Sequence, residues 1–268
     1  MDALAPPLVY QRATGDVRIT LADDRGRPRL ARSYQAGSGK LRFPRVPSGM
    51  EAMVLNTAGG LAGGDVFSLD VSVEAHALTT STQASERIYR AEGGRARVVQ
   101  TMRVAGGATL RHMPQPTILF DGAGLTRRTT VHLAEGARFT FCEGMVLGRQ
   151  AMGETVRALA LSDWTEVHLA GRLAFADAVR LDTGALTRAA TPAMLGENLA
   201  FGLVLHHGPD LAGARDSLAA ILRHGGASVV GGVLVARLLA PSHGALQDEL
   251  ARAVTHLSGT PPPRAWQL

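Results

Sequence analysis

The chain has 268 residues, of which 46% are hydrophobic, enough to fill one large core or two small ones. The net charge is +5 but unevenly distributed, and a single cysteine, Cys142, excludes an internal disulfide framework and a cysteine-rich zinc site. Many glycines and few aromatic residues favour a chain that turns often between short strands.

The N-terminal segment has an acid at Asp2 and a proline pair, and it lacks the apolar run of a signal peptide. The longest apolar stretch, residues 225–236, is far shorter than the roughly 20 residues that span a bilayer. We therefore expect a soluble, cytoplasmic protein without a membrane segment.

Basic residues concentrate in one window near the N-terminus. Seven of them occur without an acid: Arg25, Arg27, Arg29, Arg32, Lys40, Arg42 and Arg45. Such a patch suits nucleic acid or an acidic protein surface. Because no interleaved aromatic side chains are available to stack on bases, we favour a solvated or partner-facing surface and keep nucleic-acid binding as an alternative.

The body of the chain reads as β-structure. In "FSLDVSVEA", residues 67–75, apolar and polar residues alternate without error, which is typical of a strand with one buried face. Similar alternation recurs near residues 17–21, 96–104, 131–133 and 139–141, with glycine-rich turn signals between. We predict a mainly β body over about residues 10–205.

The last quarter predicts helix, strand and helix over about residues 209–257. Pro209 and Asp210 open a first helical pattern, and Gly225 and Gly226 close it. An apolar strand is expected over 228–238, then a second helix over about 242–257 that ends before the prolines at 261–263. Without a repeat or linker, we expect a single domain over residues 1–268.

The glycine loop "NTAGGLAGGD", residues 56–65, does not fit a nucleotide-binding motif. A P-loop would need a lysine and a hydroxyl residue after Gly64, where Asp65 and Val66 stand. The dinucleotide pattern fails because Leu61 occupies the second glycine position. The loop is instead interpreted as a double turn. Its four glycines, Gly59, Gly60, Gly63 and Gly64, are expected to supply positive φ, with Asp65 binding freed amides or attracting a cation beside a wet passage.

Signals for catalysis are weak. Ser81, Ser85, Glu86, His112 and Asp121 contain the residue types of a hydrolytic triad, but no G-x-S-x-G elbow orders them. His206 and His207 are neighbours and should point apart on a strand, so a shared metal is not expected. Cys142, beside Phe141, fits a small buried hydrophobe.

Four stretches in register resemble the UreD family of urease accessory proteins, called UreH in some bacteria. They are "NTAGGLAGGD" (56–65), "TTSTQASERIYRAEGG" (79–94), "MPQPTILFDGAG" (113–124) and "LGRQAMGE" (147–154), followed by a closing "PPRAWQL". Order, spacing and length agree across nearly the whole chain.

The resemblance implies a maturation factor that is not an enzyme. Proteins of this family have a helical, solenoid-like winding of many short β-strands with two C-terminal α-helices. They bind the accessory protein UreF and through it recruit the nickel-carrying GTPase UreG. The complex, expected to hold two copies bridged by a UreF dimer, docks on apo-urease and helps to deliver Ni²⁺, in one view through an internal channel.

A channel that passes nickel needs ligands that are far apart and bind the ion weakly, because a dense cluster of ligands would hold nickel firmly. We therefore expect no stable cofactor, only nickel in transit, with Asp65, Glu86, Asp121 and Glu143 as candidates to line the path. In the alternative interpretation these acids cap turns or pair with nearby arginines. Arg149 and Glu154 in "LGRQAMGE" are expected to form an internal salt bridge or a contact surface.

Two other functions stay open on sequence alone. One is a β-solenoid hydrolase that uses paired carboxylates roughly 5 to 9 Å apart in an exposed groove. The other is a basic nucleic-acid-binding protein that uses the arginine-rich window.

Overall fold

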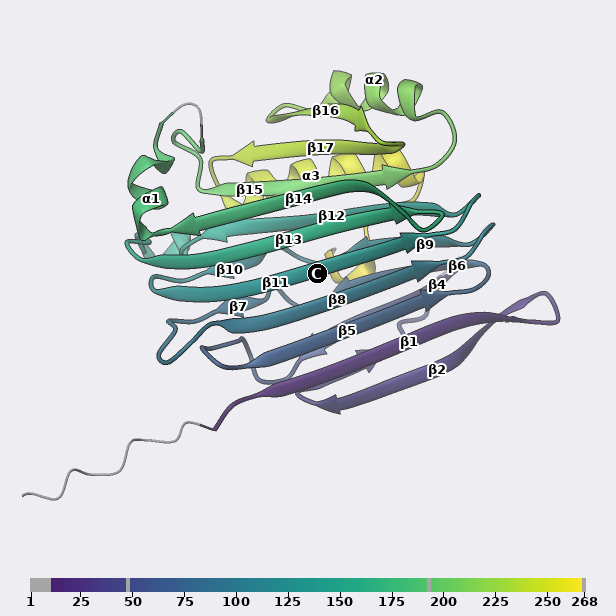
Figure 1. Ribbon diagram of the computed structural model, residues 1–268, viewed down its shortest axis with the longest axis horizontal. Helices are drawn as coiled ribbons and strands as arrows, with labels where there is room; N and C mark the ends of the chain where they lie inside the picture. The colour runs from purple at the N-terminus through teal and green to yellow at the C-terminus, as the bar shows by residue number, and fades with distance from the viewer. Residues whose placement is uncertain (1–10, 47–48, 192–193, 267–268) are drawn as a thin grey trace, which may run out of the picture.

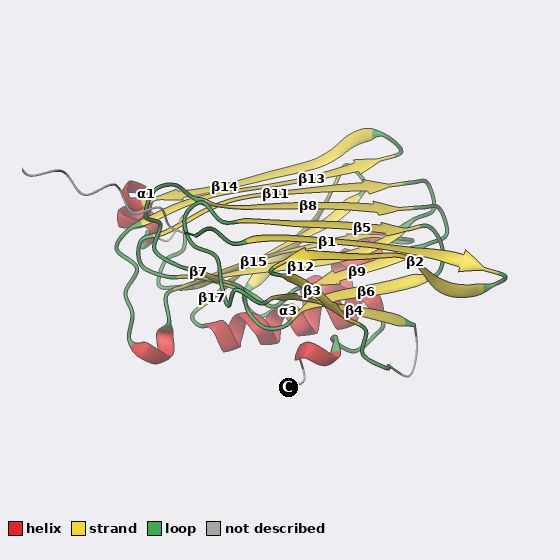
Figure 2. Ribbon diagram, turned by 90° about the horizontal axis from the view of Figure 1, so that it is seen from below, coloured by secondary structure: helices red, strands yellow, loops and turns green. Residues whose placement is uncertain are grey.

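The structure, a computed structural model, describes residues 11–46, 49–191 and 194–266. Two β-sheets are stacked, with the first in front of the second in the view of Figure 1, and the helices α2 and α3 pack on the second sheet. Seen from below, the first sheet, the second sheet and α3 form three successive layers (Figure 2).

The first sheet has seven strands in the order β14-β13-β11-β8-β5-β1-β2. The five inner strands run parallel to one another, whereas β2 and β14 pair antiparallel at the two edges. The strands are β1 (Thr14–Asp24), β2 (Arg27–Gly37), β5 (Val66–Val73), β8 (Ala96–Val104), β11 (Ala123–Leu133), β13 (Leu159–Leu169) and β14 (Arg172–Asp182).

The second sheet has ten strands, eight of them in the order β16-β17-β15-β12-β9-β6-β4-β3, with β10 pairing β12 and β7 pairing β10. Strands β4, β6, β9 and β12 are parallel neighbours. The strands are β3 (Gly39–Arg42), β4 (Met50–Asn56), β6 (Ala77–Thr82), β7 (Arg87–Ile88), β9 (Thr109–Met113), β10 (Thr117–Leu119), β12 (Arg138–Leu147), β15 (Ala200–His207), β16 (Gly225–Val230) and β17 (Val233–Ala240). β10 begins directly after Pro116, which cannot donate a ladder bond.

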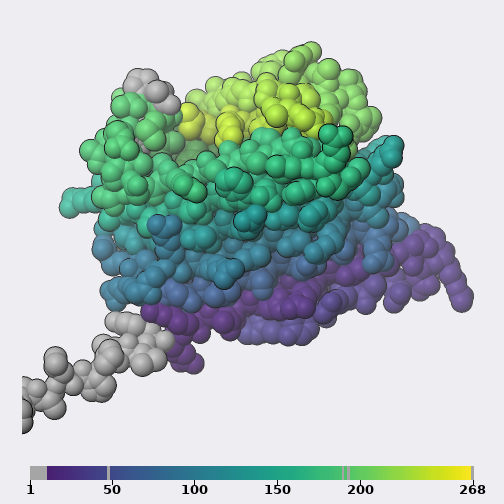
Figure 3. Space-filling view, viewed as in Figure 1, coloured from purple at the N-terminus to yellow at the C-terminus, as the bar shows by residue number. Residues whose placement is uncertain are grey.

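The chain passes from one sheet to the other and back, so that β5, β8 and β11 alternate with β6, β9 and β12. Successive parts of the chain therefore lie side by side, as the colour bands of Figure 3 show. The predicted mainly β class is confirmed, but a solenoid is not shown. The sheets are mixed, their outer strands form antiparallel hairpins, and several strands of the first sheet run for 11 residues rather than being short.

Two apolar cores follow from the alternation along the strands. Between the sheets, inward residues such as Ile19, Val71, Leu110 and Phe139 are almost fully buried. On the other face of the second sheet, a separate cluster that includes Cys142 packs against Leu246 and Leu250 of α3. Strand β12 contributes to both cores because its successive side chains point to opposite faces.

Both predicted C-terminal helices are present. α2 (Leu211–Ile221) is capped by the Asp210 side chain, which accepts from the Gly213 amide, and α3 (His243–Ser258) by Ser242, which accepts from the Ala245 amide. A third helix, α1 (Thr183–Ala189), was not predicted and lies inside the region assigned to β-structure. Two short 3-10 helices, η1 (Gln150–Met152) and η2 (Arg264–Trp266), complete the elements.

The single strand predicted over 228–238 is wrong in its extent. The chain instead forms the hairpin β16–β17, and the turn between them is Gly231–Gly232, with φ of 56° and 82°. Two successive glycines with positive φ permit the tight turn that matches the twist of paired strands. β17 also pairs β15, so the C-terminal segment extends the second sheet.

The edge strand β2 carries three residues of the basic window, Arg27, Arg29 and Arg32, all exposed. Charges on an edge strand discourage pairing with another chain, which gives these arginines a structural reason to be there. Within the described ranges, no helix has the length and apolar character needed to cross a membrane.

Candidate functional site: a polar cavity between the sheets

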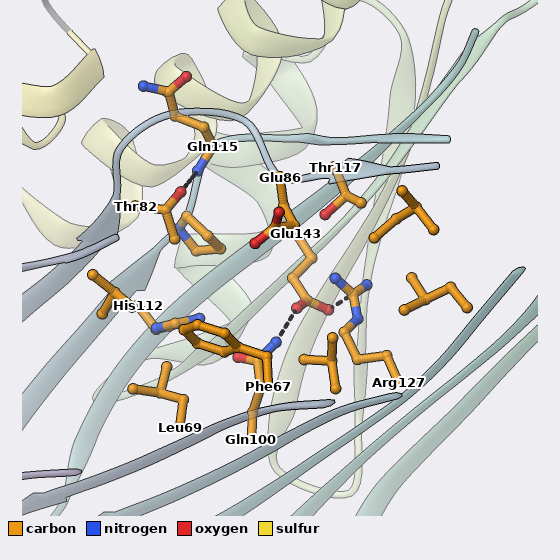
Figure 4. A pocket seen from close by; sticks show the side chains of 16 residues that line it. Phe67, Leu69, Thr82, Glu86, Gln100, His112, Gln115, Thr117, Arg127 and Glu143 are labelled. Atoms are coloured by element: carbon orange, nitrogen blue, oxygen red, sulfur yellow. Dashed lines mark hydrogen bonds and ion pairs between the residues drawn. The ribbon is translucent and has the colours of Figure 1, made fainter. Parts of the chain in front are cut away.

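A buried cluster of charges interrupts the apolar core between the sheets. Glu143 on β12 faces Arg127 on β11, with 2.9 Å between Glu143 Oε2 and the Arg127 guanidinium. The same guanidinium binds both carboxylate oxygens of Asp163 on β13, at 2.6 and 2.9 Å. Gln100 on β8 donates to Glu143 Oε1 at 3.0 Å (Figure 4). Four strands from both sheets therefore meet in one polar contact.

Strand register explains why these groups meet. Arg127 and Asp163 are directly paired neighbours on parallel strands, at positions where the adjacent residues of the same face, Leu125 and Leu161, are buried and apolar. Glu143 likewise stands between Phe141 and Met145 on the inward face of β12. Period-two alternation thus directs three charged side chains into the core.

When Glu143 is ionised, the cluster carries one excess negative charge, because Glu143 and Asp163 share a single guanidinium. Burial lowers the pKa of Arg127, but the Asp163 and Glu143 carboxylates outweigh it and raise that pKa, so the guanidinium stays charged. Burial raises the pKa of Glu143 to about 7, against the opposing effect of Arg127 and with that of Asp163. One guanidinium cannot neutralise two carboxylates, so Glu143 can exchange a proton near neutral pH.

A cavity of about 70 Å³ lies beside the cluster and is lined by Glu143, Arg127, Gln100, His112 and Glu86. Two polar atoms on this lining, His112 Nε2 and Gln100 Oε1, are buried and have no hydrogen-bond partner among the described residues. Buried polar atoms are normally satisfied by protein or water, and this volume admits water molecules. The cavity is therefore suited to hold water inside the sandwich. Burial and Arg127 lower the pKa of His112 to about 3, so its ring is neutral.

Glu86 connects this cavity to a second one. The second, of about 250 Å³, is lined by Gly59 and the segment from Thr82 to Arg87, and it shares Glu86, Phe67, Thr82 and Val54 with the first. The Glu86 carboxylate accepts from Asn56 Nδ2 at 3.2 Å and from the Arg87 amide, and burial raises its pKa. Of the four predicted transit acids, Glu86 and Glu143 thus line adjoining cavities.

Asp65 and Asp121 are placed differently. Asp65 is buried and accepts from the amides of Ala13 and Ala62, at 2.8 and 2.7 Å. Asp121 accepts from the amides of Arg157 and Ala158, which lower its pKa most, and also pairs with Arg90 at 2.5 Å. Both acids stabilise turns, as the alternative interpretation held, and neither lines the two cavities.

The glycine loop packs closely on residues 87–94, the segment that begins with β7 and leads into β8. Gly59, Gly60 and Gly64 have positive φ, whereas Gly63 does not. At Gly63 an added Cβ would lie 2.4 Å from the Gly94 oxygen, so this glycine is required by close approach. The prediction that all four glycines supply positive φ is therefore wrong at Gly63.

Arg149 and Glu154 form the predicted internal salt bridge. The Arg149 amide and side chain both donate to Glu154, at 2.9 and 3.0 Å, and Glu154 also accepts from the Asp121 amide. The Arg149 guanidinium lies over the Phe120 ring and remains about half exposed, on the wall of an open hollow of about 550 Å³. The pair holds the loop 149–154 in shape, and the half-exposed Arg149 guanidinium is open to contact from outside.

The weak catalytic candidates do not assemble. Ser81 donates to Glu51, His112 bonds Thr80, and Asp121 binds backbone amides. Cys142 is buried in the helix-side core, where burial raises its thiol pKa. No group of three or more His, Cys, Asp or Glu that could hold a metal occurs in the part of the chain that the structure describes.

Sequence reasoning missed Arg127, Asp163 and Gln100, and it named His112 only as a weak catalytic candidate. A signal for Gln100 exists, because it occupies an inward position of β8 between Val98 and Met102 and so breaks the apolar face. Arg127 and Asp163 break β11 and β13 in the same way. A polar residue on an apolar face shows that a core contains polar groups, but it does not show which groups from distant strands it will meet.

Comparison with known proteins places the chain in a family. The model of the UreD urease accessory protein family matches residues 13–267. The chain belongs to the UreD urease accessory protein family. It is 42% identical to the urease accessory protein UreD of Chelativorans sp. (strain BNC1), over 98% of this chain and 97% of that protein.

Other relatives carry the same name. The chain is 40% identical to UreD of Rhizobium leguminosarum bv. trifolii (strain WSM2304), over 96% of each chain, and 40% identical to UreD of Paracoccus denitrificans (strain Pd 1222), over 100% of this chain and 96% of that one. The resemblance found in the motifs is confirmed. Family membership supports a role in urease maturation, and an accessory role agrees with the expectation that the chain is not an enzyme.

Proposed function

We propose that this chain is a urease maturation scaffold that binds UreF, recruits UreG through it, and assists the delivery of Ni²⁺ into apo-urease. The ion passes through the interior, from the cavity beside the glycine loop, past Glu86, to the cavity beside Glu143. The sequence also suggested Asp65 and Asp121 as acids of the path. In this proposal they do not contact the ion and only stabilise turns of the scaffold.

The observation that carries the proposal is the pair of adjoining cavities with Glu86 at their junction and Glu143 at the inner end. Carboxylates separated along a wet path are ligands that a divalent cation binds weakly enough to leave. Ionised Glu143 gives the cluster one excess negative charge that attracts a cation, and a bound cation favours this ionised form over the protonated one. Arg127 keeps the second carboxylate occupied, which prevents a tight two-carboxylate site.

The test is the nickel content of urease matured in cells that carry the variant Glu143→Gln or Glu86→Gln. We expect each to lower nickel per urease severalfold while the chain still folds, because an amide keeps the size of the side chain and one acceptor oxygen but loses the charge. Nickel is measured by elemental analysis of purified urease, together with urease activity.

Glu166→Gln is the matched control. Glu166 on β13 pairs with Arg128 on β11, as Glu143 does with Arg127, but its partner Arg128 is exposed to solvent. This variant should leave nickel loading unchanged. Normal nickel content with both interior variants, in chains whose circular dichroism matches the parent, would contradict the proposed path.

The paired-carboxylate hydrolase is not favoured by the geometry. That alternative needs two acids in an exposed groove, whereas Glu143 and Asp163 are both largely buried and both occupied by Arg127.

A further inference from the structure

A row of polar residues crosses the helix-side face of the second sheet, beyond the apolar core. Cross-strand pairing aligns Glu51, Thr79, Arg111, Thr140 and His206 on five adjacent strands. The neighbouring row includes the buried residues Met113, Cys142 and Val204, which belong to the core that the helices cover. The polar row therefore marks where the apolar cover ends.

Arg111 in this row is a half-buried cation without a counter-charge. Its Nε is buried and has no partner, and its side chain makes no hydrogen bond or ion pair with any described residue. Burial lowers its pKa. The acid of the row, Glu51, binds the Ser81 hydroxyl and the Arg264 amide instead. The other buried arginine, Arg127, has two carboxylates, and this contrast makes Arg111 unusual.

Arg111 faces a pocket of about 280 Å³ whose walls carry hydrogen-bond donors. Arg138, His206 and His256 line it together with hydroxyl groups, and none of the described residues on its walls is acidic. The Thr140 hydroxyl bonds His206 at 3.0 Å, and the Ser217 hydroxyl bonds His256 at 2.8 Å, which fixes these side chains. Arg138 also has no hydrogen bond or ion pair to a described side chain.

We propose that this pocket binds a small free oxyanion, a phosphate or a carboxylate, with Arg111 as its principal ligand and Arg138 at its mouth. A guanidinium presents donors in a planar fork that matches both kinds of oxyanion. The volume is at the lower end of the range for small-molecule pockets, roughly 300 to 1,000 Å³, and it has room for a small anion together with bridging waters. The bound anion supplies the negative counter-charge that Arg111 lacks.

Titration of the purified full-length chain with inorganic phosphate, and separately with acetate, followed by calorimetry, tests the site. We expect saturable binding of at least one of them, weakened at least tenfold in Arg111→Met and in Arg138→Ala. Arg172→Met, which removes an exposed arginine at the start of β14, should bind as the parent does. Chloride at equal ionic strength should not compete.

Thermal unfolding without added anion gives a second, independent readout. Because Arg111 is an unpaired half-buried charge, Arg111→Met should not lower the melting temperature, and phosphate should raise the melting temperature of the parent but not of this variant. Absence of saturable binding of both anions would overturn the proposal, as would equal binding by parent and Arg111→Met. An Arg111→Met chain that fails to fold would overturn it as well, since Arg111 would then have a structural role. All these measurements are independent of nickel loading, so they separate this site from the proposed path.

Discussion

At the scale of single residues, the most informative feature is Glu143, a carboxylate that shares one guanidinium with Asp163. Its raised pKa has a consequence for stability. An acid whose pKa is higher in the folded state than in the unfolded chain stabilises the fold at low pH, and this contribution is lost as the pH rises through the folded value.

We predict that the parent loses stability relative to Glu143→Gln as the pH rises from about 4.5 to above 7, the interval between the ordinary and the raised pKa of Glu143. One proton accounts for at most about 1.4 kcal/mol per pH unit. Urea unfolding at pH 5, 6, 7 and 8 measures the difference. In the variant, the amide oxygen can accept from Arg127, and the amide nitrogen can donate to Gln100 Oε1 once the Gln100 amide, which now presents its nitrogen, turns over, so the fold should persist.

Glu166→Gln serves as the control for this measurement. A hydrogen bond from Trp164 is the largest cause that lowers the pKa of Glu166, so this acid itself stays ionised. Because Glu166 also contacts His168 and opposes the lowering of the pKa of His132 by burial, its removal should lower stability more at pH 5 than at pH 8, the opposite trend to Glu143. A constant offset between the parent and Glu143→Gln over the same pH range would show that Glu143 does not titrate there.

At the scale of elements, the glycine loop illustrates two different needs for glycine. Gly59 has a φ of 77° and open space around an added Cβ. Gly60 has a φ of 153°, and an added Cβ would lie 2.3 Å from the Tyr89 ring and 2.7 Å from the Arg87 oxygen. The loop and the segment at Arg87–Tyr89 also exchange backbone hydrogen bonds through Leu61.

We predict that Gly60→Ala destabilises the chain by about 2 to 4 kcal/mol, because it adds a clash to the backbone strain. Gly59→Ala should cost only about 1 kcal/mol, from the left-handed backbone alone. Urea unfolding measures both. Equal losses would mean that the loop does not pack on Tyr89 as described.

At the scale of the whole molecule, two sheets bring four strands from distant parts of the chain to one buried cluster, and an arginine-bearing edge strand remains open at one side (Figure 1). The interior and the edge suit different tasks. In the function that we propose, the interior passes an ion, whereas the basic edge can attract an acidic partner by long-range electrostatics.

We predict that the chain co-elutes with UreF in size-exclusion chromatography after co-expression. If β2 is the contact, the variant Arg27→Gln/Arg32→Gln should form the complex more slowly at low salt, since exposed charges mainly affect association rates. Arg172→Gln is the control for charge. Separate elution of the parent and UreF at every salt concentration would remove the scaffold part of the proposed function.

Local sequence determined the elements with strong periodicity or clear caps. The alternation at 67–75 predicts β5, and Asp210 and Ser242 predict where α2 and α3 begin, because these signals depend only on neighbouring residues. The motifs of the glycine loop and of "LGRQAMGE" indicated the family. The Gly231–Gly232 turn and Asp182, whose side chain caps α1 by accepting from the Ala185 amide, were present in the sequence, but such short elements give weak periodicity.

Only the tertiary structure decided which charges meet. Glu143 was predicted as a site residue, but its partners Arg127, Asp163 and Gln100 lie on other strands, and their meeting depends on how the two sheets stack and in what register. The same holds for Arg111. It lacks a counter-charge because none of the described elements packed around it places a carboxylate within reach of its guanidinium. Sequence fixes which side of a strand a residue faces, since that alternation is local, whereas the distance between charges on separate strands is set by long-range packing.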